Sequence, residues 1–346
     1  MWRWRSHLPE LRIDPLSGLR VIVAGERVDR PGGGITAPAA RVALDPETDP
    51  FLEGHEGRTP PELHASRPAG GPANGPGWTV RVVPNLYPAL TGSPAATSIP
   101  ADPLADGRGE PELFVSREAH GAHELIVNSP RPAGSLLELS VDELTLAMEA
   151  WGDRIRVHPS APYVHVLVNE GAEAGASLPH THAQLYALPF VPAAVARERE
   201  RFTAYAERTQ GRNLLEDLIQ SEVKLGRRLV GVDRDAVAIC PFASRSPFEL
   251  QIVPRAPRAR FEDPGALGAG LLHEVLGRLE SALGALPPLN LWVRTAPRGA
   301  THWCWRIDVV PRLTRLAGLE LGTGIHMNVL PPERAAAVLR GDETLG

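Results

Sequence analysis

The sequence predicts an α+β protein in which one arrangement of strands occurs twice. Short runs of β-branched residues bounded by Pro, Gly and Asn predict strands, and longer amphipathic stretches predict helices over 139–158 and 193–226. Ser140 followed by Glu143 offers a capping box for the first helix. The expected strands that carry the repeat cover 123–128, 163–169, 182–190, 248–253, 290–295 and 304–310.

The repeat indicates two related halves. HELIVNSP at 123–130 resembles FELQIVP at 248–254, and PYVHVLVNEG with PHTHAQLYALP resembles PLNLWVRTAP with THWCWRIDVVP about one domain length later. We expect halves at 1–192 and 193–346, with both histidines of PHTH kept only in the first. The aligned pairs are His180 with His302, His182 with Cys304, and Gln184 with Arg306.

Composition narrows the class of protein. The 43% hydrophobic and 22% charged residues are typical of a soluble globular chain, and no apolar run approaches the roughly 20 residues of a membrane span. A net charge of -5 without a basic block argues against a polynucleotide partner. Only Cys240 and Cys304 are present, and no secretion signal is recognised, so we expect a cytoplasmic protein.

The densest group of reactive residues lies at 169–184. A predicted strand ends at Asn169 and runs into the glycine-rich GAEAGAS, whose backbone amides can bind phosphate oxygens, with Ser177 adding a hydroxyl. Alternate side chains of the returning strand project to one side of it. Three residues are therefore expected to face the same concavity: His180, His182 and Gln184.

The residues alone leave three interpretations of the two histidines. A neutral imidazole can attack phosphorus when its other ring nitrogen donates a hydrogen bond, and Gln184 can then hold a phosphoryl oxygen. His-x-His on a strand also commonly binds Zn²⁺ or Fe²⁺, although no neighbouring DxH or HxxE pair completes such a site. Two structural histidines on one apolar strand are the third interpretation.

The same stretch resembles the active-site motif of the galactose-1-phosphate uridylyltransferase family, a branch of the histidine-triad superfamily. That motif reads Asn-x-Gly, then a Gly-Ala/Cys-Ser turn, then His-Pro-His-Gly-Gln. Four further segments resemble the family in order: 11–31, FLEGHEGRTPPEL, RVVPNLYPAL and PRLTRLAGLELGTGIHMNVLPPERAAAVLR. The matching motif residues are Asn169, Gly171, Gly175, Ser177, His180, His182 and Gln184.

The resemblance implies a duplicated histidine-triad fold with an antiparallel sheet, and a homodimer. It implies a ping-pong reaction in which His182 attacks the α-phosphorus of a UDP-sugar, releases the sugar 1-phosphate and passes the uridylyl group to another sugar 1-phosphate. It also implies that His180 is the partner that holds His182, and that Gln184 belongs to the catalytic residues and binds a non-bridging phosphoryl oxygen. Around the substrate the resemblance places Arg27, Arg30, Asn85, Asn169, Gly175, Ser177 and Glu320.

Departures from the family concern its metals. Asp49-Pro50-Phe51-Leu52 stands where the family often has Cys-Pro-x-Cys, and Pro132 stands at a further His position, so His180 alone remains of four zinc ligands. At a second metal site of some members Glu198 remains. The three histidines of that site are replaced by Arg294, Arg306 and Asp308. We therefore expect no metal and no other cofactor.

Three functions follow from the resemblance. The first is uridylyl transfer between a UDP-sugar and a hexose 1-phosphate, and the second is phosphorolysis or hydrolysis, in which phosphate or water resolves the His182 adduct. The third is non-catalytic nucleotide binding, against which the retained His182, Gln184 and arginines argue. Thr181 and Ala183 replace the Pro and Gly of the motif, so the choice of substrate stays open.

Overall fold

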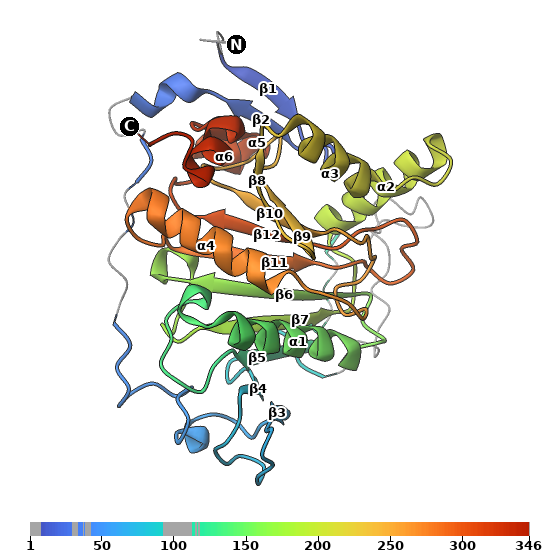
Figure 1. Cartoon of the computed structure of the whole chain (residues 1–346). Helices are drawn as coiled ribbons and strands as arrows, with labels where there is room; N and C mark the ends of the chain where they lie inside the picture. Colours follow the sequence, from blue (N-terminus) through green and yellow to red (C-terminus); the bar gives the residue numbers. More distant parts are fainter. Residues whose placement is uncertain are drawn as a thin grey trace.

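A large antiparallel sheet runs through the computed structural model, with a small second sheet at its upper end in the view of Figure 1. Helices α1 (Val141–Val157) and α4 (Ala269–Leu283) lie side by side against one face of the large sheet (Figure 1). The structure describes residues 8–29, 34–36, 38, 43–92, 113, 114, 116 and 118–345.

The large sheet has ten strands in the order β3-β4-β5-β7-β6-β11-β12-β10-β9-β8. The strands before residue 192 are β3 (His64–Ser66), β4 (Val80–Pro84), β5 (Ala122–Val127), β6 (Tyr163–Glu170) and β7 (His182–Leu188). Those after it are β8 (Leu229–Val232), β9 (Ala236–Ile239), β10 (Leu250–Pro254), β11 (Leu289–Arg294) and β12 (Arg306–Pro311). Every neighbouring pair is antiparallel.

The strand order confirms the duplicated α+β fold. The order β4-β5-β7-β6 is repeated in mirror arrangement as β9-β10-β12-β11, and the two sets join where β6 pairs with β11. Helix α1 connects β5 to β6 as α4 connects β10 to β11. Each helix covers the apolar side of its own strands, so the repeated unit is strand, helix and strand together. The boundary after residue 192 stays a prediction.

The predicted helices are partly corrected. The capping box of Ser140 and Glu143 opens α1 as expected. The single helix expected over 193–226 is two, α2 (Ala193–Arg208) and α3 (Leu214–Leu225). Gln210 has a φ of +60° directly after the C-cap Thr209, and the Gly211 N–H then bonds back to the Ala206 carbonyl, which ends the first helix. The Asn213 side chain caps the second by accepting from two backbone N–H groups.

The alternation of side chains divides the sheet into an apolar and a polar face. Ala183 and Leu185 of β7 and Val168 of β6 belong to the core cluster under α1 and α4. Since successive side chains point to opposite faces, His182 and Gln184 leave the sheet on the other side. The site residues of β7 therefore project from the face that these two helices leave uncovered.

The small sheet brings the two ends of the chain together. Strand β2 (Arg20–Val23) pairs antiparallel with β1 (Glu10–Ile13) and parallel with β13 (His326–Asn328). The short helices α5 (Gly318–Thr323) and α6 (Pro332–Arg340) flank β13 in sequence. In the described part of the chain no helix has the length and apolar character needed to cross a bilayer.

Candidate active site

His182 is the first residue of β7 and is buried. Its Nδ1 lies 2.7 Å from the carbonyl oxygen of His180. A carbonyl only accepts, so Nδ1 carries the ring proton and Nε2 carries the lone pair. Burial, with a smaller effect from the charge of His180, lowers the pKa of His182 below its ordinary value. The geometry presents a neutral imidazole with a fixed tautomer.

His180 is held differently from the expectation that it shares one concavity with His182 and Gln184. The strand begins only at His182, so its alternation does not extend back to His180. The Nδ1 of His180 lies 2.6 Å from Asp49 Oδ2 and its Nε2 lies 2.9 Å from the carbonyl oxygen of Ser129. Both partners are acceptors, so both ring nitrogens of His180 donate and neither is left as a nucleophile.

The segment around Asp49 packs on both histidines. Phe51 has its ring centroid 6.0 Å from that of His180 and 5.1 Å from that of His182. Asp49 is itself held, because its Oδ1 accepts a hydrogen bond from the Phe51 N–H at 2.9 Å. Sequence reasoning treated this segment only as a lost metal loop. Its structural role is to hold the ring of His180, whose carbonyl in turn orients His182.

The residues at the family's zinc position do not fit a zinc ion. Asp49 and His180 are hydrogen-bonded directly to each other, while Leu52 and Pro132 offer no side-chain donor atom. Within the described ranges no three His, Cys, Asp or Glu side chains are grouped as a metal site. The Asp49 carboxylate and the His180 imidazole are in direct contact, which leaves no room for a metal ion between them.

A guanidinium group lies at the second metal position of the family. Arg306 donates to the two oxygens of Glu198 at 3.0 and 3.2 Å and to Asp308 at 2.9 Å. Burial alone would lower the pKa of Arg306, because it disfavours the charged guanidinium. The negative charges of Asp308 and Glu198 outweigh that effect and raise the pKa. A fixed organic cation therefore neutralises these carboxylates, and the set does not fit an iron ion.

The glycine-rich connection between β6 and β7 depends on two positive φ angles. Gly171 has φ +84° and Gly175 has φ +89°, on either side of the short helix Ala172–Ala174. A Cβ added at Gly171 would lie 2.9 Å from Pro288 Cβ, so a larger residue would also clash. These glycines let the chain turn tightly between Asn169 and His182.

Asn169 is oriented from the second half of the chain. Asn290 on β11 donates from Nδ2 to Asn169 Oδ1 at 2.8 Å and to the Ala174 carbonyl at 2.7 Å. Asn290 is the cross-strand partner of Asn169. Val168 pairs with Ala183 on the apolar face, so the next residues along the two strands, Asn169 and His182, both project from the polar face. Sequence reasoning missed Asn290; its signal was its place in the repeated segment PLNLWVR.

Three of the predicted substrate-binding residues line one cleft of about 910 Å³: Arg27, Asn169 and Glu320. The pairing of β2 with β13 explains this, since it brings the short helix Gly25–Asp29 beside the C-terminal segment. Glu320 also accepts from the Ala317 N–H at 2.9 Å. His182 and Gln184 are absent from this cleft lining, and Arg30 lies outside the described residues.

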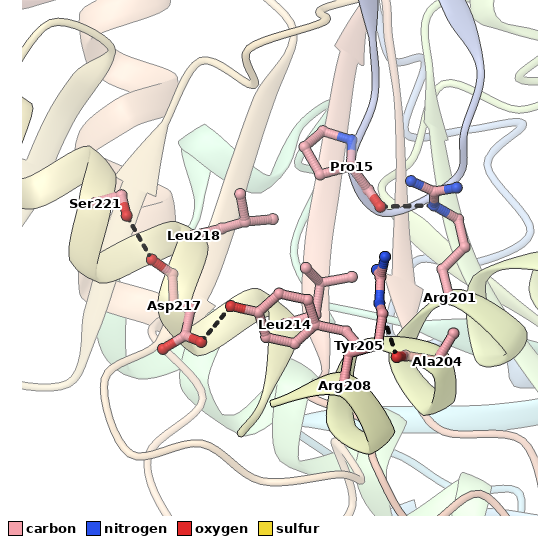
Figure 2. A pocket seen from close by; sticks show the side chains of 9 residues that line it. All are labelled: Pro15, Arg201, Ala204, Tyr205, Arg208, Leu214, Asp217, Leu218 and Ser221. Carbon is pink, nitrogen blue, oxygen red and sulfur yellow. Dashed lines mark hydrogen bonds between the residues drawn. The ribbon is translucent and has the colours of Figure 1, made fainter. Parts of the chain in front are cut away.

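The remaining predicted residues lie on other sides of the motif. Ser177 lines a separate hollow of about 490 Å³ together with Gly171 and Pro179. Asn85 follows β4, and its Nδ2 lies 3.0 Å from Nε2 of His123, a residue that sequence reasoning missed. A further hollow between α2 and α3 contains none of the predicted site residues among its lining (Figure 2).

A family model described as galactose-1-phosphate uridyl transferase, N-terminal domain, matches residues 2–192. ADP-glucose phosphorylase of Arabidopsis thaliana is 31% identical, covering 96% of this chain and 92% of the relative. The chain belongs to the galactose-1-phosphate uridyl transferase family. A second model, a domain of unknown function (DUF4921), matches residues 130–340.

Two further comparisons agree with this membership. A probable galactose-1-phosphate uridylyltransferase of Drosophila melanogaster is 28% identical, covering 97% of this chain and 95% of the relative. The crystal structure of an ADP-glucose phosphorylase from Arabidopsis thaliana with bound ADP-glucose superposes with a TM-score of 0.78 at 29% identity, covering 96% of this chain and 99% of that one. The family's fold therefore extends over nearly the whole chain.

Proposed function

We propose that this protein is a nucleotidyltransferase that takes a nucleoside monophosphate from a nucleoside diphosphate sugar onto His182. The observation that carries the proposal is the hydrogen bond from His182 Nδ1 to the His180 carbonyl, which leaves the Nε2 lone pair available. Membership in a family whose relatives are nucleotide-sugar enzymes supports the choice of substrate class.

The proposed first step is a displacement at phosphorus. The Nε2 lone pair of His182 forms a bond to the α-phosphorus, the bond from that phosphorus to the bridging oxygen breaks, and the sugar 1-phosphate leaves with the electron pair. The Nδ1 proton stays on the ring and donates to the His180 carbonyl as positive charge develops on the imidazole. Gln184 would bind a non-bridging oxygen, and Arg27 and Arg30 the diphosphate.

Two acceptors are proposed for the second step. A hexose 1-phosphate oxygen that attacks the adduct gives a new nucleotide sugar and completes uridylyltransferase chemistry. Inorganic phosphate that attacks instead gives a nucleoside diphosphate, which is phosphorolysis. The 31% identity to ADP-glucose phosphorylase over 96% of the chain favours this second candidate. Either acceptor returns His182 to its starting tautomer.

The experiment that tests the proposal is detection of the adduct. Incubation with UDP-glucose or ADP-glucose and no acceptor should add one nucleoside monophosphate to the protein, stable in alkali and labile in acid as a phosphoramidate is. His182→Asn should bind the nucleotide sugar and form no adduct, whereas His180→Asn should form it slowly. An adduct undiminished in His182→Asn, or none in the wild type with a broad panel of nucleotide sugars, contradicts the proposal.

The two acceptors are separated by adding each to the isolated adduct. Release of UDP-galactose on adding galactose 1-phosphate supports the uridylyltransferase, and release of ADP or UDP on adding phosphate supports the phosphorylase. The proposed partners are thus small molecules. The homodimer implied by the family and the cytoplasmic compartment stay predictions, the first testable by analytical ultracentrifugation.

A further inference from the structure

The side-chain oxygen of Gln184 accepts two hydrogen bonds from the protein. Tyr186 Oη donates to Gln184 Oε1 at 2.9 Å, and His123 Nε2 lies 3.3 Å from the same oxygen. An amide has one oxygen that accepts and one NH₂ group that donates. With its oxygen directed at these two donors, Gln184 has its NH₂ group turned away from them.

The tautomer of His123 is fixed by a backbone group. The Ala89 N–H donates to His123 Nδ1 at 3.1 Å, so that nitrogen carries no proton. A neutral imidazole must then carry its proton on Nε2, which makes Nε2 the donor to Gln184. The Asn85 Nδ2 lies 3.0 Å from the same nitrogen, but it is a donor as well, since its own Oδ1 accepts from the Tyr87 N–H, so the group that can accept the Nε2 proton is Gln184 Oε1.

The sheet register makes this arrangement rigid. His123 on β5 is the direct cross-strand partner of Tyr186 on β7, and their rings stack with centroids 4.1 Å apart at 24°. Gln184 pairs with Leu125, two residues along each strand from the pair of His123 and Tyr186. His123 and Gln184 are therefore diagonal neighbours on the same face of the sheet. Two strands and the loop after β4 thereby hold both donors in place.

We propose that His123 and Tyr186 are positioning residues that lock the amide of Gln184 with its NH₂ group toward the transferring phosphoryl group. A freely rotating amide would present its oxygen to the anion part of the time, and that orientation repels a phosphoryl oxygen. In the reversed orientation the NH₂ group would face the Nε2–H of His123, which cannot accept, and Tyr186 would have to turn its hydroxyl to accept instead of donate. The amide is set before the substrate arrives.

This inference rests on the proposed function, and it concerns the rate of adduct formation. Tyr186→Phe keeps the ring stack on His123 and removes one donor to Gln184. Loss of one such hydrogen bond should slow single-turnover adduct formation by about fivefold to tenfold, with affinity for the nucleotide sugar nearly unchanged. Rapid-quench measurement on the full-length protein, with binding followed by calorimetry, gives both quantities.

A matched control is available elsewhere in the chain. Tyr205 on α2 donates its hydroxyl hydrogen to Asp217 at 2.6 Å, beside the hollow between α2 and α3 (Figure 2). Tyr205→Phe removes the same chemical group and one hydrogen bond, in a hollow whose lining contains none of the predicted site residues. It should leave the rate of adduct formation unchanged. A slowing equal to that of Tyr186→Phe would overturn the assignment.

A double-mutant cycle with Gln184→Ala tests whether Tyr186 acts through Gln184. If it does, Tyr186→Phe should have no further effect on adduct formation once Gln184 is removed, and the same should hold for His123→Phe. Full effects that persist in the Gln184→Ala background overturn the proposal. If the wild type forms no adduct, the proposed function itself fails; a wild-type adduct with unaffected variants rejects the positioning role alone.

Discussion

Asp49 Oδ2 lies 2.6 Å from Nδ1 of His180, and both side chains are buried. The two residues are 131 positions apart in the sequence, and their contact fixes the backbone from which His182 receives its hydrogen bond. Burial alone would raise the pKa of Asp49, because it disfavours the charged carboxylate. The hydrogen bond and charge of His180 outweigh that effect and lower the pKa of Asp49.

Asp49→Asn should destabilise the fold at neutral pH, because it leaves His180 without a carboxylate in a buried place. The expected loss in the free energy of unfolding is about 3–5 kcal/mol, the usual cost of breaking a buried pair. A group with a lowered folded pKa stabilises above its unfolded value, 3.8, and loses that contribution as pH falls through the folded pKa. Urea denaturation should therefore show the two proteins converging in acid.

Asp153→Asn is the control for that change. Asp153 also forms an ion pair, with Arg156, but its side chain is 59% exposed. Exposed pairs contribute little to stability. Equal destabilisation by the two variants, or a difference between Asp49→Asn and the wild type that is as large well below pH 3.8, past the folded pKa of Asp49, as it is at pH 7, would argue against a buried ion pair.

The purified protein should hold no stoichiometric zinc or iron. The direct contacts of His180 with Asp49 and of Arg306 with Glu198 use the atoms that a metal would need. Elemental analysis of untagged protein, before and after dialysis against a chelator, measures this together with adduct formation. About one tightly held ion per chain, lost together with activity on chelation, would refute the prediction.

Glu198→Gln should lower stability without slowing adduct formation. Glu198 and Arg306 are both buried, so removing the carboxylate charge leaves a guanidinium short of its partner and should cost about 3–5 kcal/mol of unfolding free energy. Glu200→Gln, an exposed position on the same helix, is the matched control. A large loss of adduct formation in folded Glu198→Gln protein would place this network in the active site instead.

Local pattern was sufficient for the elements around the site and insufficient for the contacts between them. Alternation over 163–169 and the capping box at Ser140 predicted β6 and α1 because both signals are carried by neighbouring residues. The pairing of Asn290 with Asn169 spans 121 positions and arises from the join between the two halves. Nothing periodic surrounds Asp49, so its contact with His180 could not be predicted.

Arg27→Ala should weaken nucleotide-sugar binding by roughly 10-fold to 100-fold, the scale of a lost charge-assisted hydrogen bond. Arg27 is exposed in the cleft that Asn169 and Glu320 also line, so the fold should be almost unaffected. Lysine should restore binding only in part, because it lacks the planar fork. Arg20→Ala, exposed on β2, is the control in calorimetry; affinity unchanged in Arg27→Ala would remove Arg27 from the site.

Adduct formation should slow in acid, and the midpoint of its pH–rate profile should lie below pH 6.5. Burial is the largest cause of the lowered pKa of His182 and the charge of His180 adds to it, while the backbone hydrogen bond to His180 and the charge of Asp49 act in the opposite sense. Only the neutral ring has a lone pair on Nε2, so the rate should be level well above the lowered pKa and fall as pH passes through it, below pH 6.5. Rapid-quench rates across pH, with thermal melts at each pH to exclude unfolding, measure this limb. A midpoint at or above pH 6.5 in folded protein would mean that the imidazole attacking phosphorus is not the buried one of His182.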